Sequence, residues 1–187
     1  MDLIITTFVV VALAVAVVTD LRQQRIPNAL TFSTALAGLA YHFTTGGADG
    51  LLFALAGLGM GLALMLVPYL LGVMGGGDVK LMAALGACLG WQLIAEAFLY
   101  SSLAGGVYAL VILLARHRDM LLRILKNFWI TLWLFLASKK AEYAPVRGGE
   151  KLPRLCYGVA IAAGTCAALL RVAHDSGLIS GLVSGLV

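Results

Sequence analysis

Long apolar runs separated by short polar segments account for most of this chain. The runs are continuous rather than alternating, which favours helices in a lipid bilayer over the strands of a barrel. We expect six membrane spans, which cover residues 3–18, 29–43, 51–72, 79–90, 93–115 and 155–173. The pattern therefore predicts a single all-α integral membrane domain over residues 1–187, with its water-facing surface confined to loops.

One apolar run is shorter than the others. Residues 127–137 would extend only about 16 Å as a helix, which is too short to cross a bilayer. Trp129 and Trp133 lie one helical turn apart within it. We interpret residues 119–138 as an amphipathic helix that lies in the membrane interface, and a hairpin that dips into the membrane is the alternative.

Composition supports a membrane protein and excludes several other classes. The 187 residues are 61% hydrophobic and 12% charged, whereas a soluble domain is about 45–50% apolar and about 25% charged. The net charge of +4 is assigned to cytoplasmic loops rather than to a nucleic-acid partner. Cys88, Cys156 and Cys166 show no Cys-x-x-Cys spacing. We therefore expect no metal site, no disulfide framework and no cofactor.

The basic residues sort to one side of the membrane if the loop after the first span is cytoplasmic. Only Arg171 then lies toward the outside. The cytoplasmic residues are Arg22, Arg25, Lys80, Arg116, Arg118, Arg123, Lys126, Lys139, Lys140, Arg147, Lys151 and Arg154. This positive-inside bias predicts that both termini lie outside. It also places Asp20 and Asp78 on the same, cytoplasmic, side.

Asp20 and Asp78 differ from the other carboxyls because each stands at the cytoplasmic end of an apolar run. An acid in this partly dry zone is costly, which suggests that it has a function. Two carboxyls held close together there cannot both ionise cheaply, so they share a proton. One can accept a proton from water while the other donates a proton to a substrate carbonyl. This is the division of labour of an aspartic protease.

Three glycines precede the second acid. An extended substrate must bring its backbone close to the acids, and Gly75, Gly76 and Gly77 carry no side chain that would obstruct it. They also allow positive φ and offer amide N–H groups that could orient a carboxylate or the substrate. The structural alternative is a helix break in which Asp78 is an ordinary N-cap for the helix over residues 79–90.

The segment Gly75-x-Gly77-Asp78-x-Lys80 matches the G-x-G-D-x-K signature of the prepilin peptidases, which are intramembrane aspartic proteases. Asp20-Leu21-Arg22 with Arg25-Ile26-Pro27-Asn28 resembles the first-aspartate loop of that family. The similarity also includes residues 83–92 and 157–162, so it covers most of residues 1–173. The resemblance implies that Asp20 and Asp78 are catalytic and that the supporting or substrate-binding residues are Gly75, Gly76, Gly77, Lys80, Arg22, Pro27 and Asn28.

The role of Lys80 stays open among three possibilities. It could contact the acidic pair, hold a lipid phosphate headgroup or follow the positive-inside rule. A departure from the family lies before the last span, where many members have Pro directly before a Tyr/Phe-Gly step. Here Cys156 precedes Tyr157, which leaves the contact of this segment with the site open.

The resemblance implies an endopeptidase that removes the short basic leader of a type IV or Flp-like prepilin. It implies a bacterial inner-membrane protein with its active site facing the cytoplasm. The expected partners are the prepilin precursor and membrane lipid, without nucleic acid, and a homo-oligomer is allowed. Because no cysteines are paired as in the zinc site of larger members, the chain resembles the short, peptidase-only form of tight-adherence systems. N-methyltransferase activity is not expected.

Two functions of other classes remain as alternatives. A small proton-coupled transporter would also use membrane acids and broken helices, but it predicts acids deep in the spans and an internal repeat. The sequence shows neither feature. A non-catalytic assembly factor of a pilus or secretion complex is the second alternative, and it would not explain a requirement for both aspartates.

Overall fold

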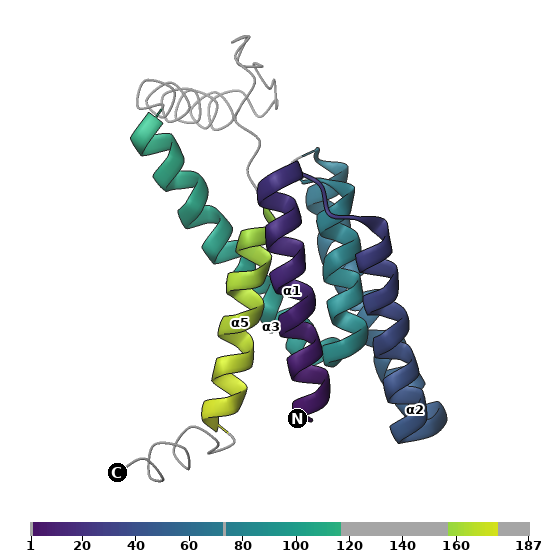
Figure 1. The fold of residues 1–187 in the computed structure, drawn as a ribbon. Helices are drawn as coiled ribbons and strands as arrows, with labels where there is room; N and C mark the ends of the chain where they lie inside the picture. Colours follow the sequence, from purple (N-terminus) through teal and green to yellow (C-terminus); the bar gives the residue numbers. More distant parts are fainter. Residues whose placement is uncertain (1, 73, 117–156, 176–187) are drawn as a thin grey trace, which may run out of the picture. The chain divides into compact units, whose positions relative to one another are not determined.

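Four helices make up nearly all of the described chain. A computed structural model describes residues 2–72, 74–116 and 157–175. The helices are α1 (Leu3–Gln23), α2 (Asn28–Leu70), α3 (Gly76–Arg116) and α5 (Tyr157–Asp175) (Figure 1). These described residues contain no strand. Each of the four helices is long and apolar enough to cross a membrane, so the predicted class, an all-α membrane protein, is confirmed.

The chain divides into two compact units. The first contains residues 1–105 and 156–187, and the second contains residues 106–155. Of the second unit, the structure describes only the helical residues 106–116. The predicted interfacial helix at 119–138 and Cys156 lie outside the described residues. Everything discussed below concerns the first unit.

Helices α2 and α3 are each interrupted at one glycine. Gly47 in α2 has φ 59° and ψ −137°, and Gly90 in α3 has φ 79° and ψ 171°. A straight α2 of 43 residues would be about 64 Å long, about twice the hydrocarbon thickness. Gly50 instead lies against the carbonyl oxygen of His42, although these residues would be about 12 Å apart in a straight helix. The chain therefore folds back at Gly47.

This geometry corrects the expected boundaries. Helix continues on both sides of Gly47, so the gap between the expected spans 29–43 and 51–72 is reduced to a break at one residue. The second break falls at Gly90, between the predicted spans 79–90 and 93–115. The described chain contains four helices that are long and apolar enough to span, so the count of six spans stays a prediction.

The first half of α3 is the central packing element of the first unit. Residues 81–90 are all buried, although most helices of a small membrane protein expose one face to lipid. Gly57 and Gly61 of α2 lie against the backbone of Gly86 and Met82, where a Cβ atom would collide. Glycines spaced by four residues allow this close approach of two helices. Gly59, which lies between them in the sequence, faces open space.

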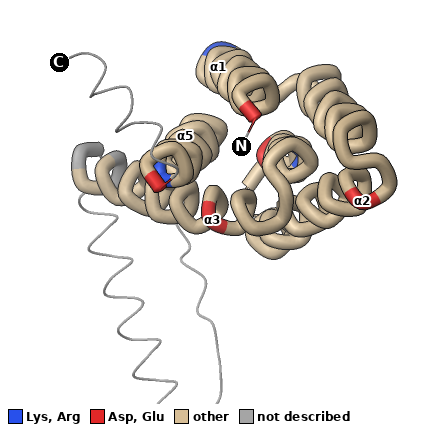
Figure 2. Tube along the Cα trace, turned by 90° about the horizontal axis from the view of Figure 1, so that it is seen from below, with Lys and Arg blue, Asp and Glu red and all other residues tan. Residues whose placement is uncertain are grey.

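The opposite faces of the helices carry large exposed apolar side chains. They include Leu3, Phe32, Leu36, Leu99, Leu103 and Leu170. Charged residues are few along the described helices (Figure 2). A soluble protein rarely exposes so much contiguous apolar surface, whereas a bilayer covers it at no cost.

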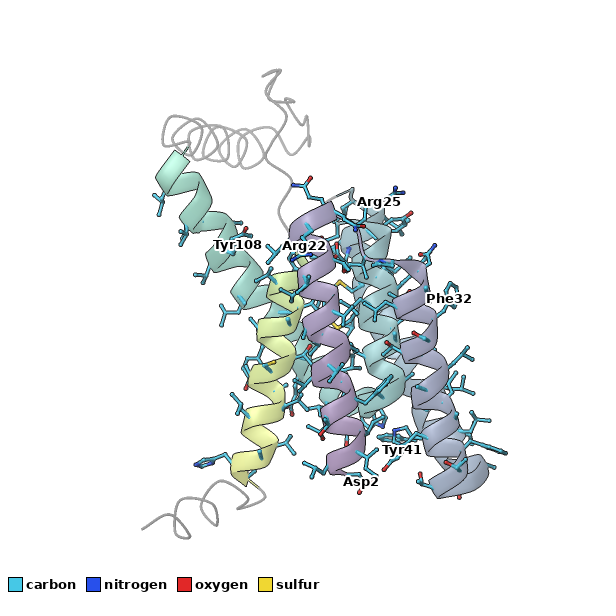
Figure 3. The ribbon with its side chains drawn as sticks, in the orientation of Figure 1. Asp2, Arg22, Arg25, Phe32, Tyr41 and Tyr108 are labelled. Carbon is cyan, nitrogen blue, oxygen red and sulfur yellow. The ribbon has the colours of Figure 1, made fainter. Side chains whose placement is uncertain are left out.

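The two ends of the helices differ in chemistry. Arg22 and Arg25 lie at the end of α1, whereas Asp2 and Tyr41 lie at the opposite end (Figure 3). There the Tyr41 hydroxyl donates a hydrogen bond of 2.6 Å to Oδ2 of Asp2. Helix α1 runs antiparallel to α5, so the last turn of α1 lies beside the first turn of α5 (Figure 1). This end holds the candidate site.

Candidate functional site

Asp20 lies in the last turn of α1 and is buried, with 6% of its surface exposed. The turn is closed by Gln24, which adopts the left-handed conformation at φ 50° and donates its N–H to the Asp20 carbonyl at 2.8 Å. The Asp20 side chain accepts a hydrogen bond of 2.9 Å at Oδ2 from the N–H of Gly158. A carboxylate held by a backbone donor is well suited to a buried position.

Asp78 lies in the first turn of α3 and is half-buried. The helix begins at Gly76, three residues earlier than expected, so Asp78 is not the N-cap. Its Oδ2 accepts a hydrogen bond of 3.3 Å from the N–H of Gly75. This is the contact that the third helical residue makes in a capping box. The expectation that a glycine amide of this segment orients a carboxylate is thus confirmed for Gly75.

The fold brings the two acids together from different helices. The charge of Asp20 acts on the Asp78 carboxyl, and the charge of Asp78 also reaches Tyr157. Residues from the end of α1, the start of α3 and the start of α5 therefore share one site. Two carboxyls in such mutual range can divide the roles of acid and base.

The glycine run differs from our expectation. None of Gly75, Gly76 and Gly77 has a positive φ, whereas Gly72 does, at 72°. A Cβ atom on Gly77 would lie 3.3 Å from Cβ of Ile26, and one on Gly76 would lie 3.6 Å from Cε2 of Tyr69. Because Gly76 and Gly77 begin a regular helix, their φ angles are ordinary. At Gly77 the absence of a side chain makes room for the side chain of Ile26 from the same protein.

The other predicted supporting residues are exposed and have separate contacts. Lys80 donates a hydrogen bond of 3.0 Å from Nζ to Oδ1 of Asn28. The Pro27 carbonyl accepts the N–H groups of the first turn of α2, at 3.1 and 3.4 Å. Arg22 lies in the last turn of α1, where a positive charge favours the helix dipole. Pro27 therefore has an evident role at the start of α2, and Arg22 has one at the end of α1.

Sequence reasoning missed three residues at this site. Gly158 donates to Asp20, Tyr157 lies in range of Asp78, and Ile26 is buried against Gly77. The Tyr157-Gly158 step was visible as part of the family resemblance, but its contact with the first acid joins residues 138 positions apart. The structure answers the open question about this segment, because Gly158 touches Asp20.

The described residues were also compared with the requirements of a metal centre. Among residues 2–72, 74–116 and 157–175, no group of three His, Cys, Asp or Glu side chains could hold a metal ion. The described cysteines are Cys88, which is buried, and Cys166, which is partly buried, and both have free thiols.

The fold and the paired acids define a class: a helical membrane protein with a candidate acid–base site at one end of its helices. Over residues 7–110, more than half of the chain, the sequence matches the model of the type IV leader peptidase family. The chain therefore belongs to that family, which confirms the resemblance to prepilin peptidases. Membership supports a leader-peptidase function in general. Neither the curated proteins nor the solved structures include a significant match to this chain.

Proposed function

We propose that this chain is an intramembrane aspartic endopeptidase with Asp20 and Asp78 as its catalytic pair. One observation carries the proposal. A buried carboxyl at the end of α1 and a half-buried carboxyl at the start of α3 lie within electrostatic range of each other. Both acids also fall within the stretch matched by the leader peptidase family.

The proposed reaction needs only the two carboxyls and water. The ionised carboxylate takes a proton from water, and the water oxygen attacks the scissile carbonyl carbon. The protonated carboxyl gives its proton to the carbonyl oxygen. The tetrahedral intermediate then collapses, the C–N bond breaks and the leaving nitrogen receives the proton that the first carboxylate took from water. A hydroxyl of the intermediate returns a proton to the second carboxyl. The Gly158 and Gly75 amides hold Asp20 and Asp78, respectively, so the pair loses little freedom during the reaction.

The proposed substrate is the short basic leader of a type IV or Flp-like prepilin, cut on the cytoplasmic side of a bacterial inner membrane. Arg22, Arg25 and Lys80 accompany the two acids in sequence, which supports a cytoplasmic site by the positive-inside rule. Folding back at Gly47 and a break at Gly90 support six crossings. We propose peptidase activity without N-methylation.

Co-expression with a prepilin tests the catalytic pair. We expect Asp20→Asn and Asp78→Asn each to reduce cleavage at least about a thousandfold while the proteins still accumulate in membranes. Asp49→Asn is the matched control, because Asp49 is exposed and lies beside the Gly47 break. Parental cleavage by either of the first two variants would exclude the proposed pair.

Labelling of single cysteines tests the orientation, in a background without the three native cysteines. A cysteine at Gln24 should react with an impermeant reagent only from the cytoplasmic side. A cysteine at Asp49 should react only from the outside. Both positions are exposed, so a reversed pattern would contradict the proposed cytoplasmic site rather than report burial.

A further inference from the structure

The segment between α1 and α2 contacts the first two turns of α3 at two places. Ile26 is buried, with 8% of its surface exposed. A Cβ atom on Gly77 would lie 3.3 Å from its Cβ and 3.6 Å from its backbone N. Two residues further on, Oδ1 of Asn28 accepts the hydrogen bond of 3.0 Å from Nζ of Lys80. These contacts join the chain that follows Asp20 to the turn that carries Asp78.

Each half of this connection is joined through a few residues of backbone to its own acid. On one side, Gln24 closes the last turn of α1 directly onto the carbonyl of Asp20. On the other side, Gly77 precedes Asp78 in the same helical turn, and Lys80 lies in the next turn. A displacement of Asn28 relative to Lys80 therefore changes the separation of the two carboxyls. Acid–base catalysis by a pair depends steeply on that separation.

We propose that Asn28 and Lys80 form a positioning pair that sets the spacing between Asp20 and Asp78. This proposal rests on the proposed function, because the Asn28–Lys80 pair would align the catalytic pair Asp20 and Asp78. Lys80 is thereby assigned a specific partner, which distinguishes it from Arg22 and Arg25. Among the described residues, those two arginines have no side-chain hydrogen bond. The Ile26–Gly77 contact supplies the buried part of the same connection.

The geometry also explains why an asparagine at position 28 and a lysine at position 80 suit this contact. An ammonium group offers three donors and the Asn side-chain oxygen accepts two hydrogen bonds, so the contact tolerates rotation of either side chain. Lys80 is exposed, and its long stem lets Nζ reach across to the start of α2. A hydrogen bond with one charged partner is stronger than a neutral one, which suits a contact that is open to water.

A double-mutant cycle tests the pair with purified protein and a prepilin substrate. Asn28→Leu removes the acceptor, and Lys80→Met removes the ammonium while keeping the stem. We expect each single variant to lower kcat by about fivefold to tenfold with KM within about twofold of the parent. The double variant should be no slower than the slower single variant, because both changes remove the same hydrogen bond.

Conservative variants separate positioning from a general structural role. Asn28→Asp and Lys80→Arg both keep a donor–acceptor contact, so each should retain at least about half of the parental kcat. Arg25→Met is the charge control, since it removes a positive charge from the same segment without touching the pair. It should leave kcat near the parental value.

Two results would overturn the pair. The first is a double variant whose fold-loss in kcat equals the product of the fold-losses of the two single variants. The second is a raised KM for Lys80→Met with normal kinetics for Asn28→Leu, which would assign Lys80 to substrate or headgroup binding. Asp78→Asn separates this failure from that of the proposed function. If Asp78→Asn still cleaves, the proposed dyad is wrong. Non-additive melting temperatures of the four cycle proteins then still decide whether the two side chains are coupled.

Discussion

The N–H of Gly158 donates a hydrogen bond of 2.9 Å to Oδ2 of Asp20, so the first turn of α5 holds the acid at the end of α1. Gly158 is the second residue of α5. Its N–H is one of the N-terminal donors that have no partner within the helix. The Asp20 carboxylate satisfies this donor and lies at the positive end of the α5 dipole. One contact thus both caps α5 and orients a proposed catalytic acid.

This contact predicts that Gly158→Ala impairs cleavage. A Cβ atom at this position would lie 2.8 Å from Oδ2 of Asp20 and 3.2 Å from its Cβ and Cγ. Because Asp20 is buried, it cannot move aside freely. We expect a loss of about tenfold to a hundredfold in kcat, measured on a prepilin substrate. Gly59→Ala is the control, since a Cβ atom there meets nothing within 4 Å, and equal rates for the two variants would contradict the prediction.

The second prediction separates two explanations of the glycine run. If Gly77 is needed for contact with Ile26, Gly77→Ala should lower cleavage and thermal stability together, since its Cβ would be 3.3 Å from a buried side chain. A crowded core contact costs about 1–3 kcal/mol. Gly76→Ala should cost less, because its nearest neighbour is the Tyr69 ring at an ordinary 3.6 Å.

Unfolding of both glycine variants in detergent, together with their cleavage kinetics, distinguishes the explanations. If the glycines serve only substrate access, both alanine variants should raise KM and leave stability unchanged. Equal stability of Gly77→Ala and Gly76→Ala would therefore exclude the Ile26 contact as the reason for Gly77.

The sequence was informative where one physical effect dominates. Hydrophobic run length predicted the helices, because a bilayer requires long uninterrupted apolar segments. The distribution of arginine and lysine predicted that Asp20 and Asp78 share one end, and the structure brings them into electrostatic range. Both inferences depend on averages over many residues, which local packing does not reverse.

Details that depend on a single contact were less predictable. The start of α3 at Gly76 rather than after Asp78 is a detail of a helix end, which the sequence pattern specifies poorly. The chain reverses at Gly47 alone, with helix on both sides, and the turn-like composition of this stretch does not show which of its residues carries the break. The Gly158 contact joins the first described helix to the last. No local pattern encodes that pairing, because any small residue at the start of an apolar run looks the same.

Gly57 and Gly59 offer a third prediction, which concerns the packing of α2 on α3. Gly57→Ala should destabilise the protein by about 1–3 kcal/mol, because its Cβ would collide with the backbone of Gly86. Gly59→Ala should be neutral or stabilising by up to about 1 kcal/mol, since Gly59 faces open space in a helix interior. Chemical unfolding in the same detergent measures both. A comparable loss for the two variants would show that the close approach at Gly57 is absent.

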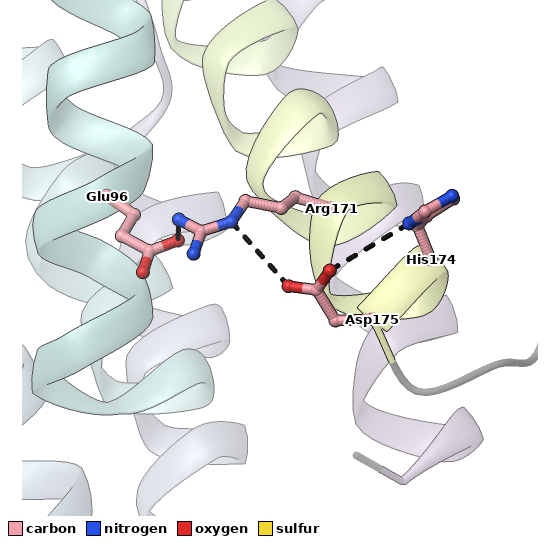
Figure 4. A network of polar contacts seen from close by, with 4 residues as sticks. All are labelled: Glu96, Arg171, His174 and Asp175. Carbon is pink, nitrogen blue, oxygen red and sulfur yellow. Dashed lines mark hydrogen bonds and ion pairs between the residues drawn. The ribbon is translucent and has the colours of Figure 1, made fainter.

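The last prediction concerns the ion pair between Nη1 of Arg171 and Oε2 of Glu96, which are 3.0 Å apart (Figure 4). Arg171 also lies 3.7 Å from Oδ2 of Asp175. The Arg171 and Glu96 side chains are 53% and 37% exposed. We therefore expect a coupling of at most about 1 kcal/mol, which salt should weaken. Arg171 is about 20 Å from Gly158 along α5, so cleavage should not change.

A cycle of Glu96→Gln, Arg171→Gln and the double variant measures this coupling from unfolding at low and high salt. The expected result places the pair in water at the membrane surface, where the two partners are solvated when apart. A coupling well above about 3 kcal/mol with no response to salt would instead mean that the pair lies in a medium of low dielectric constant. The exposed fractions of the two side chains would then describe contact with lipid, and the span of α5 would extend past Arg171.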